Sequence, residues 1–337
     1  MSTKLTSSEL ASLWTSYMND SMSNCILKYF LKHIEDEEIR PIVQFAYDLT
    51  TTHKKQLTTI FEMEEIPIPT SFTLENDVNL NAPRLFTDIF KLTYINHMAK
   101  VGLLAYSSYI AMSARKDVRN YFLTGLQEAS ELYDRSSDVS LSKGIFVRAP
   151  YMAYPQTTEF INSKKYLNGY SLFHKQRPLN AIEISHLFMN VQTNIIGHKL
   201  TIGFAQTSPR RDVQNWLFRG AEIAKKHVEV FAKTLLDNNI QAPASSDAGI
   251  TNSTVPPFSD RLILFHMDLL SGAGIGNYAT GAAASQRTDL FVEYERMSLE
   301  IAKYAKDGAE LMIDHGWLEQ PPGTLNKQQL ARTKDTE

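Results

Sequence analysis

The stretches DLTTTHKKQLTTIFEMEEIPIP (residues 48–69) and EIAKKHVEVFAKTLLDNNIQAP (residues 222–243) decide the fold of this chain. Each is a helical pattern that ends in a proline, and each carries one histidine at the same place, His53 in the first and His227 in the second. Apolar residues recur at helical spacing on the face that holds the histidine, so both imidazoles are predicted to point into a core. Two copies of one pattern indicate an internal repeat.

The repeat extends over nearly the whole chain. A shift of 174 positions aligns residues 5–69 with 179–243 without a gap, and it pairs Phe30 with Phe204. After the following loop a shift of 172 holds, and it pairs Tyr106 with Tyr278. We therefore predict two homologous domains, a linker that lies on the domain surfaces and a disordered tail. These are a first domain at 4–150, a linker at 151–177, a second domain at 178–322 and a disordered tail at 323–337.

Each domain is predicted to consist of four helices. In the first domain the periodic segments lie near 7–34, 38–64, 87–113 and 116–141, and Ser7 or Ser8 is the candidate N-cap of the first helix. Short turns join helices 1 and 2 and helices 3 and 4, whereas a proline-rich segment of about 20 residues joins helices 2 and 3. A ferritin-like bundle needs such a crossover between its two hairpins. The predicted fold is all-α: two tandem ferritin-like four-helix bundles, each with a long crossover between helices 2 and 3.

The ends of the two repeats carry a family resemblance. The segment HGWLEQPP (315–322) closes the second repeat, and KGIFVRAP (143–150) echoes it in the first. These segments and the tandem layout resemble a family of unknown function from Bacillus-type spore formers (DUF3231), which is related to spore coat protein F. The resemblance covers nearly the whole chain. It implies a ferritin-like fold and an association with spores, and it implies no reaction.

Composition excludes several classes of partner. The net charge is −3 and no long run carries one sign, so neither nucleic acid nor an anionic membrane is expected as a partner. No apolar run reaches the roughly 18–20 residues of a membrane span, and the N-terminus lacks the apolar core of a signal peptide. The single cysteine, Cys25, fits a reducing compartment. We expect a cytoplasmic protein, with the spore association that the resemblance implies.

A metal centre is the sharpest functional hypothesis. Di-iron ferritin-like proteins place Glu on two helices and Glu-x-x-His on the other two. The positions three residues before His53 and His227 hold Thr50 and Ala224, so the full di-iron motif is absent from both domains. Polar residues nevertheless lie near the middle of several predicted helices, and carboxylate with imidazole suits iron, manganese or zinc. The candidate metal ligands are His198, His227 and Glu300 in the second domain, and Asp20, His53 and Glu128 in the first.

Three functions compete for these residues. The favoured one is a core polar network, in which a facing glutamate satisfies each buried imidazole, inside a non-enzymatic structural or interaction protein. Such a protein would bind protein partners or a second copy of itself, perform no catalysis and need no cofactor. The second is a metal-binding or redox protein with a single Fe, Mn or Zn ion. The third is a binding module for an apolar or aromatic small molecule, held in a bundle cavity or between the domains.

A stripe of small residues is the remaining feature of the second repeat. It consists of Gly272, Gly276, Ala279 and Ala283 on the third predicted helix of that repeat. Small residues allow a neighbouring helix to approach closely, so the stripe is predicted to pack inside the bundle. The alternative is an interface between the domains or between chains.

Overall fold

Long helices joined as antiparallel hairpins build the chain. The computed structural model describes residues 3–169, 176–244, 247–327 and 330–331. Apart from two isolated β-bridges, the regular structure of the described residues is entirely helical, so the fold is all-α. The elements are α1 (Ser7–Lys32), α2 (Arg40–Met63), α3 (Leu74–Asp77), α4 (Asp88–Met112), α5 (Lys116–Ser142), η1 (Lys164–Leu167), α6 (Ala181–Thr207), α7 (Arg211–Leu236), α8 (Asp260–Ala284) and α9 (Thr288–Asp314).

The first helix of each repeat begins with a capping box. The predicted cap at Ser7 or Ser8 is wrong, because the Thr6 hydroxyl accepts the Glu9 backbone N–H while the Glu9 carboxylate accepts the Thr6 N–H at 2.7 Å. Asn180 and Glu183 form the same reciprocal pair at the start of α6. Such a pair satisfies helix N–H groups that have no partner within the helix. The two copies therefore start their first helices by the same local chemistry.

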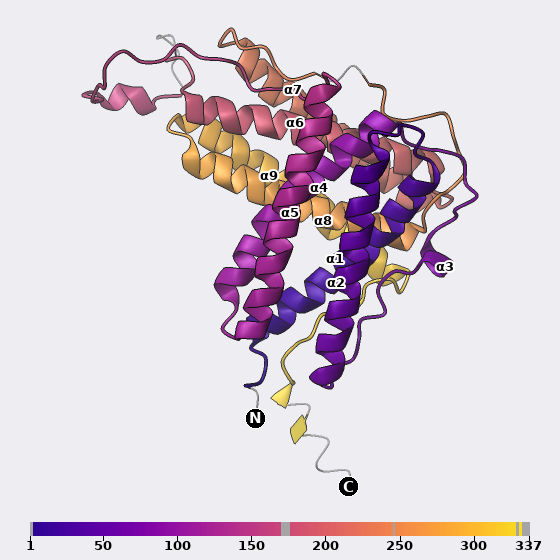
Figure 1. Ribbon diagram of the computed structural model, residues 1–337. Helices are drawn as coiled ribbons and strands as arrows, with labels where there is room; N and C mark the ends of the chain where they lie inside the picture. Colours follow the sequence, from indigo (N-terminus) through magenta and orange to yellow (C-terminus); the bar gives the residue numbers. More distant parts are fainter. Residues whose placement is uncertain (1–2, 170–175, 245–246, 328–329, 332–337) are drawn as a thin grey trace.

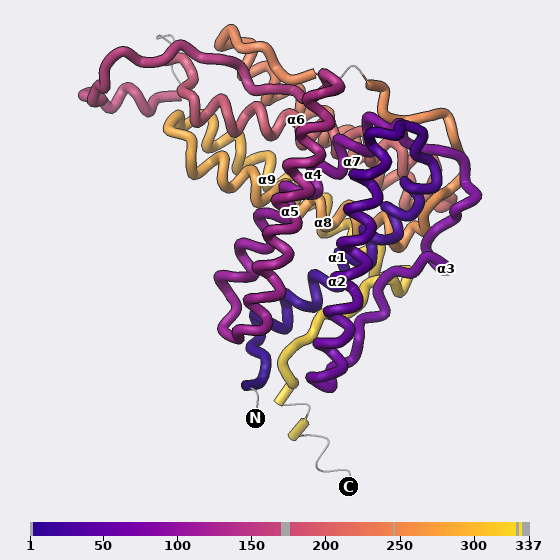
Figure 2. Tube along the Cα trace, viewed as in Figure 1, coloured from indigo at the N-terminus to yellow at the C-terminus, as the bar shows by residue number. Residues whose placement is uncertain are grey.

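The long helices pack as two sets of four. In the first set α1 packs on α2 and α4 on α5, and the two hairpins meet through α1 with α4 and α2 with α5. The second set repeats these neighbours with α6, α7, α8 and α9. Figure 1 shows the second set crossing the upper part of the first at a steep angle. In Figure 2 the chain leaves the lower end of α2, passes α3 on the outside and returns to the upper end, where α4 begins.

The two sets share a core where their crossovers meet. Val78 pairs with Phe258, and Phe86 pairs with Ile250, as isolated antiparallel bridges. Under the repeat register Val78 corresponds to Ile250 and Phe86 to Phe258, so each bridge is the symmetry copy of the other. Around them one apolar cluster contains buried residues of both sets, including Phe30 and its equivalent Phe204. The repeats are thus joined by a common hydrophobic core as well as by the linker.

Several segments outside this core were also the subject of predictions. The linker exposes large side chains such as Phe160, and Cys25 is buried. The tail predicted to be disordered lies partly outside the described residues, and its described part includes helical residues at 327, 330 and 331. None of the helices in the described ranges combines the length and the apolar composition needed to cross a bilayer.

Candidate functional site

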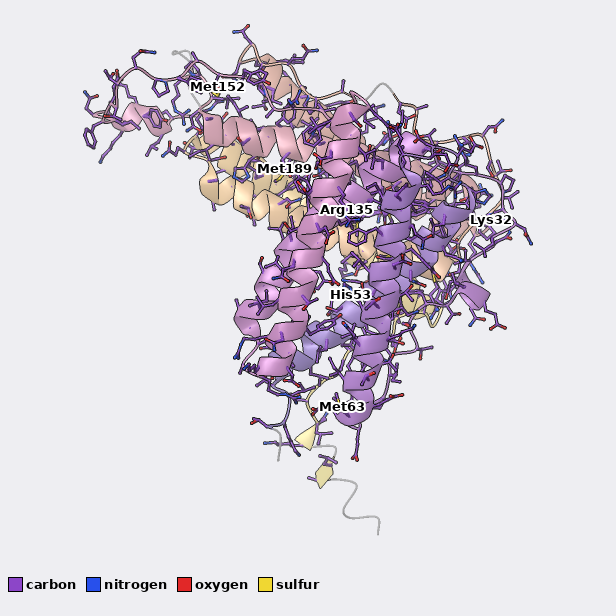
Figure 3. The ribbon with its side chains drawn as sticks, in the orientation of Figure 1. Lys32, His53, Met63, Arg135, Met152 and Met189 are labelled. Carbon is purple, nitrogen blue, oxygen red and sulfur yellow. The ribbon has the colours of Figure 1, made fainter. Side chains whose placement is uncertain are left out.

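His53 lies inside the first set of helices, about midway along it (Figure 3). Its Nε2 is 2.7 Å from a carboxylate oxygen of Glu128 on α5, and its Nδ1 is 3.5 Å from Asp20 on α1. The hydroxyl of Tyr106 on α4 lies 3.3 Å from the same Nδ1. Burial alone would lower the pKa of His53, but the carboxylates of Asp20 and Glu128 raise it to about 10. The contacts with Asp20 and Glu128 therefore favour the imidazolium form of the side chain.

A cavity of about 140 Å³ opens beside this network. Its wall is mostly apolar, with Ile95 and Met98 from α4 and Leu132 from α5. One side is polar, because Asp20 and Ser16 from α1 also line it. Asp20 Oδ2 and Ser16 Oγ are buried, and neither has a hydrogen-bond partner among the described residues. Buried polar atoms normally have partners, so this wall is ready to receive a hydrogen-bond donor.

The second set holds a closely related network around His227. Its Nδ1 is 2.9 Å from the Tyr278 hydroxyl and its Nε2 is 3.2 Å from Glu300. The Asn194 amide donates to the same hydroxyl at 2.8 Å. One proton arrangement satisfies these three contacts: Nε2–H donates to Glu300, the Tyr278 hydroxyl donates to Nδ1, and Asn194 donates to the Tyr278 oxygen. The hydroxyl then has no proton left for Asn194 Oδ1, which is 3.1 Å away. Burial lowers the pKa of His227, which agrees with a neutral imidazole.

One substitution distinguishes the two networks. The position of Asp20 in the first repeat is occupied by Asn194 in the second. A carboxylate facing the imidazole favours its charged form, whereas an amide does not. In the second repeat, Lys226 donates to Glu300, the equivalent of Glu128, at 2.8 and 3.0 Å. This ion pair weakens the effect of the Glu300 carboxylate on the pKa of His227. The repeats therefore carry one charged and one neutral histidine at equivalent positions.

The space beside the histidine also differs between the repeats. The cavity wall of the first repeat includes Gly125 and Ala129. The equivalent positions of the second repeat hold Met297 and Ile301, both buried. At Gly125 this space is already taken by the Tyr106 ring, 2.8 Å from the place where a Cβ would lie. At Ala129 the small side chain lines the cavity, where the second repeat has the larger Ile301. The first repeat thus combines a charged network with a cavity, and the second has a larger buried side chain, Ile301, at the position of Ala129.

The six candidate metal ligands are brought together only in part. His198 Nδ1 donates to the Ala221 carbonyl at 2.9 Å, and no hydrogen bond or ion pair joins His198 to His227 or Glu300. The three first-repeat residues come together, but each His53 ring nitrogen faces a carboxylate, so neither offers a free lone pair to a metal. Within the described ranges no group of three or more His, Cys, Asp or Glu side chains is placed to hold a metal ion.

Comparison with protein families places the chain. Residues 1–157 and 168–330 match the model of a family described as a protein of unknown function, DUF3231. The chain belongs to this family. Among solved structures, this DUF3231 protein is similar to a crystal structure from Bacillus halodurans of a protein provisionally described as a spore coat protein. The two are 16% identical, the similarity covers 44% of this chain and 98% of the other, and the TM-score is 0.42. A comparison with curated proteins found no match.

Sequence reasoning missed part of this site in the DUF3231 chain. Ser16 and Gly125 were not among the candidates, although both line the cavity. The signal lay in the difference between the repeats, because Gly125 stands opposite Met297 and Ser16 opposite Asn190 in the repeat register. The size difference at Gly125 is taken up by the Tyr106 ring, which lies 2.8 Å from the place of a Cβ, so this signal alone does not locate the cavity.

Proposed function

We propose that this protein is a non-enzymatic binding protein whose first repeat holds a small amine with an apolar body. The observation that carries the proposal is the cavity beside His53, with Asp20 Oδ2 unpartnered in its wall. An ammonium group donates hydrogen bonds and carries the charge that a buried carboxylate attracts. The apolar part of the wall would surround the body of the ligand, which is the usual composition of small-molecule sites.

Charge balance supports a cationic ligand. Two carboxylates, Asp20 and Glu128, face one imidazolium, so the layer holds one negative charge in excess when both are ionised. Burial raises the pKa of Asp20, because removal from water disfavours its charged form, and His53 opposes this effect. A ligand ammonium beside Asp20 would stabilise the carboxylate and restore neutrality. Binding should therefore be accompanied by a change in the protonation of Asp20.

Size limits the ligand. A cavity of about 150 Å³ in another protein core holds benzene. The cavity here is about 140 Å³, so a single ring or a short branched chain fills it. Benzylamine is a suitable probe. Benzyl alcohol is a matched control that lacks the charge, and toluene is a matched control that lacks every polar atom.

Calorimetric titration with the three compounds tests the proposal. We expect saturable binding of benzylamine at one site, weaker binding of benzyl alcohol and the weakest binding of toluene. Ala129→Ile introduces the residue of the second repeat and should abolish binding by filling the cavity. Asp20→Asn should weaken the binding of benzylamine at least tenfold and leave the affinity for toluene unchanged. Undiminished binding to Ala129→Ile, or a cavity that holds only water and gives no saturable signal, would overturn the proposal.

We also propose that each set of four helices is a ferritin-like bundle. It is supported by the pairing of helices within each set, where the two hairpins meet through first with third and second with fourth long helices. The long outer connection between α2 and α4 also supports it (Figure 2). A crystal structure of the first repeat, superposed on ferritin-like bundles, tests this assignment directly.

An interaction role is a second candidate function, and the linker favours it. Tyr151, Tyr154 and Phe160 are 89%, 89% and 99% exposed, and Ile161 is largely exposed beside them. Exposed aromatic side chains gathered in one segment are typical of protein contacts. We propose that the partner is a second copy of the chain. Sedimentation equilibrium should show a dimer that Tyr154→Ser with Phe160→Ser dissociates, and a monomeric wild-type protein would contradict this role.

The spore association implied by the family resemblance is also a proposal. It predicts that the protein is enriched in purified spores relative to vegetative cells of the organism that makes it. Immunoblots of the two fractions and of extracted coat layers test this. Equal amounts in both fractions would place the protein outside any spore-specific structure.

A further inference from the structure

A second and larger space lies between the two repeats. It is a cleft of about 1290 Å³, walled by α4 on one side and by α6 and α8 on the other. The segment 144–147, which follows α5, closes one end, and the Gln192 amide ties it to α6 by donating to the Val147 carbonyl at 3.1 Å. Met189, labelled in Figure 3, lines the cleft from α6. Small-molecule sites often occupy such places between domains.

The α4 wall carries two unpaired nitrogen bases one helical turn apart. His97 is only 8% exposed and lines the cleft, and no hydrogen bond to its ring is seen among the described residues. Lys100 has no carboxylate partner in the described ranges, and its ammonium lies over the Tyr133 ring at 5.6 Å. Burial lowers the pKa of His97 to about 4, so the imidazole is neutral and retains one N–H donor. Burial also lowers the pKa of Lys100.

This pair has the properties of a site for an anionic group. Residues three apart on a helix lie on one face, so His97 and Lys100 reach the same part of the cleft. A carboxylate between them would accept one hydrogen bond from each and replace the hydration that Lys100 loses on burial. Both side chains line the cleft, so their N–H groups are available to a ligand there.

The opposite wall is suited to an apolar chain. Gly272 and Gly276 on α8 line the cleft, and nothing lies within 4 Å of the place where either would carry a Cβ. The predicted packing of this small-residue stripe inside the bundle is therefore wrong. All four residues of the stripe are exposed, and the two glycines place no side chain in the cleft between the repeats. Ile145 and Phe146 provide apolar side chains at the end of the same space.

The remaining charges of the cleft set the orientation of a ligand. Asp268 on α8 has no hydrogen-bond or ion-pair partner in the described ranges, and burial raises its pKa. It would repel an anionic head from the α8 wall, or accept a hydrogen bond from a hydroxyl on the ligand. Lys199 on α6 donates to the Asp247 backbone carbonyl. The α4 wall is therefore the place for an anion.

We propose that the cleft between the repeats binds an amphipathic carboxylic acid, with its carboxylate at Lys100 and His97 and its apolar chain along Gly272 and Gly276. This site is separate from the amine cavity of the first repeat. The two have different charge requirements, and they are tested by different probes and different variants.

Decanoate is the probe, and 1-decanol is its uncharged control. Titration followed by calorimetry should show saturable binding of decanoate to the full-length protein at one site, tighter than that of 1-decanol. Lys100→Met keeps an unbranched side chain only one atom shorter and removes its charge. It should weaken the binding of decanoate about tenfold or more and change the affinity for 1-decanol less than twofold.

A filled cleft provides the second variant. Gly276→Leu places a side chain in open space and should abolish binding of both compounds. It replaces glycine by a better helix former at an exposed position, so the urea midpoint of unfolding should stay the same or rise. Decanoate binding that survives either variant unchanged, or no saturable binding to the wild type at millimolar decanoate, would overturn the proposal. Benzylamine binding measured on the same samples shows whether the amine cavity fails independently.

Discussion

Tyr94 and His266 hold the same position in the two repeats and form a hydrogen bond with each other, with 3.1 Å between Oη and Nε2. The contact is buried in the shared core, where His266 is fully inaccessible to solvent. Burial lowers the pKa of His266 to about 3, so the neutral ring accepts the Tyr94 proton at Nε2. A contact between equivalent residues lies on the local twofold axis that relates the repeats. The sequence difference between them makes the pair complementary, because one is a donor and the other an acceptor.

Tyr94→Phe should therefore destabilise both repeats together. It leaves His266 without any hydrogen bond, because Nδ1 already has no partner among the described residues. An unsatisfied buried acceptor costs about 1–3 kcal/mol. Urea unfolding followed by circular dichroism should show this loss in a single transition, since the two sets share one core. Tyr154→Phe, at a position 89% exposed, is the control with no expected change. Two separate transitions would show that the junction does not couple the repeats.

The two core histidines should give the free energy of unfolding opposite dependences on pH. The pKa of His53 is raised to about 10, above the roughly 6.5 of an unfolded histidine, so its stabilising contribution is full below pH 6.5 and is lost as pH rises to about 10. The pKa of His227 is lowered, so its contribution is lost as pH falls below about 6.5. Each unit of pKa shift corresponds to about 1.4 kcal/mol. Nuclear magnetic resonance titration of the imidazole carbons measures both values.

Exchanging one residue between the repeats is the matched control for this difference. Asp20→Asn should lower the pKa of His53, and Asn194→Asp should raise that of His227, because the facing carboxylate favours the imidazolium. The alkaline loss of stability should diminish in Asp20→Asn. If both imidazole pKa values stay unchanged in these variants, the carboxylate of Asp20 does not set the charge of His53.

Much of the fold was predictable because each helical pattern occurs twice in the sequence, so the two copies could be compared. The predicted first helix near 7–34 compares with Ser7–Lys32, and the second near 38–64 with Arg40–Met63. The inward direction of His53 and His227 followed from the spacing of apolar residues, and both are buried. The joint between the repeats was not predictable in this way. Val78 and Phe258 are far apart in sequence, and pairing of crossover segments leaves no periodic pattern.

The candidate site was predictable in its residues but not in its contacts. Asp20, His53 and Glu128 come together: Asp20 and His53 lie midway along inward-facing helical stripes, and Glu128 flanks the stripe of its helix. His198 lies on a similar stripe but donates to a backbone carbonyl, and helix periodicity cannot distinguish these two outcomes. The exposure of the small-residue stripe on α8 could not be predicted from the sequence. Gly272 and Gly276 face the cleft because the second set crosses the first, and that angle is a property of the assembled core.

Metal occupancy should be low in the purified protein. In the first repeat a metal would have to displace the proton between His53 and Glu128, which are 2.7 Å apart. In the second, Lys226 already occupies the carboxylate of Glu300. Mass spectrometric metal analysis, after growth with iron, manganese and zinc, should find less than half an equivalent of each per chain, with no change in His227→Ala. A full equivalent that disappears in His53→Ala would support the metal-binding alternative.

Glu9 is a buried carboxylate whose loss should weaken the first repeat. It accepts N–H groups from Ala114 and Arg115 at 2.9 and 2.6 Å, and so fixes the start of α1 to the turn between α4 and α5. Glu183 makes the same contacts with Gln286 and Arg287, both at 3.1 Å, in the second repeat.

Glu9→Gln removes the charge from these hydrogen bonds while it keeps the shape of the side chain. Hydrogen bonds to a charged group contribute about 1.5–3 kcal/mol, so the free energy of unfolding should fall by about 2–3 kcal/mol. Burial alone would raise the pKa of Glu9, but the backbone donors, Arg115 foremost, lower it below the usual value. The stabilisation is therefore present at neutral pH and is lost as pH falls through the lowered pKa, so wild type and variant should converge in acid. Glu131→Gln, which removes an exposed ion pair with Arg135, is the control and should change stability by less than about 0.5 kcal/mol. An equal effect of the two substitutions at neutral pH would show that the buried contacts of Glu9 do not hold the helices together.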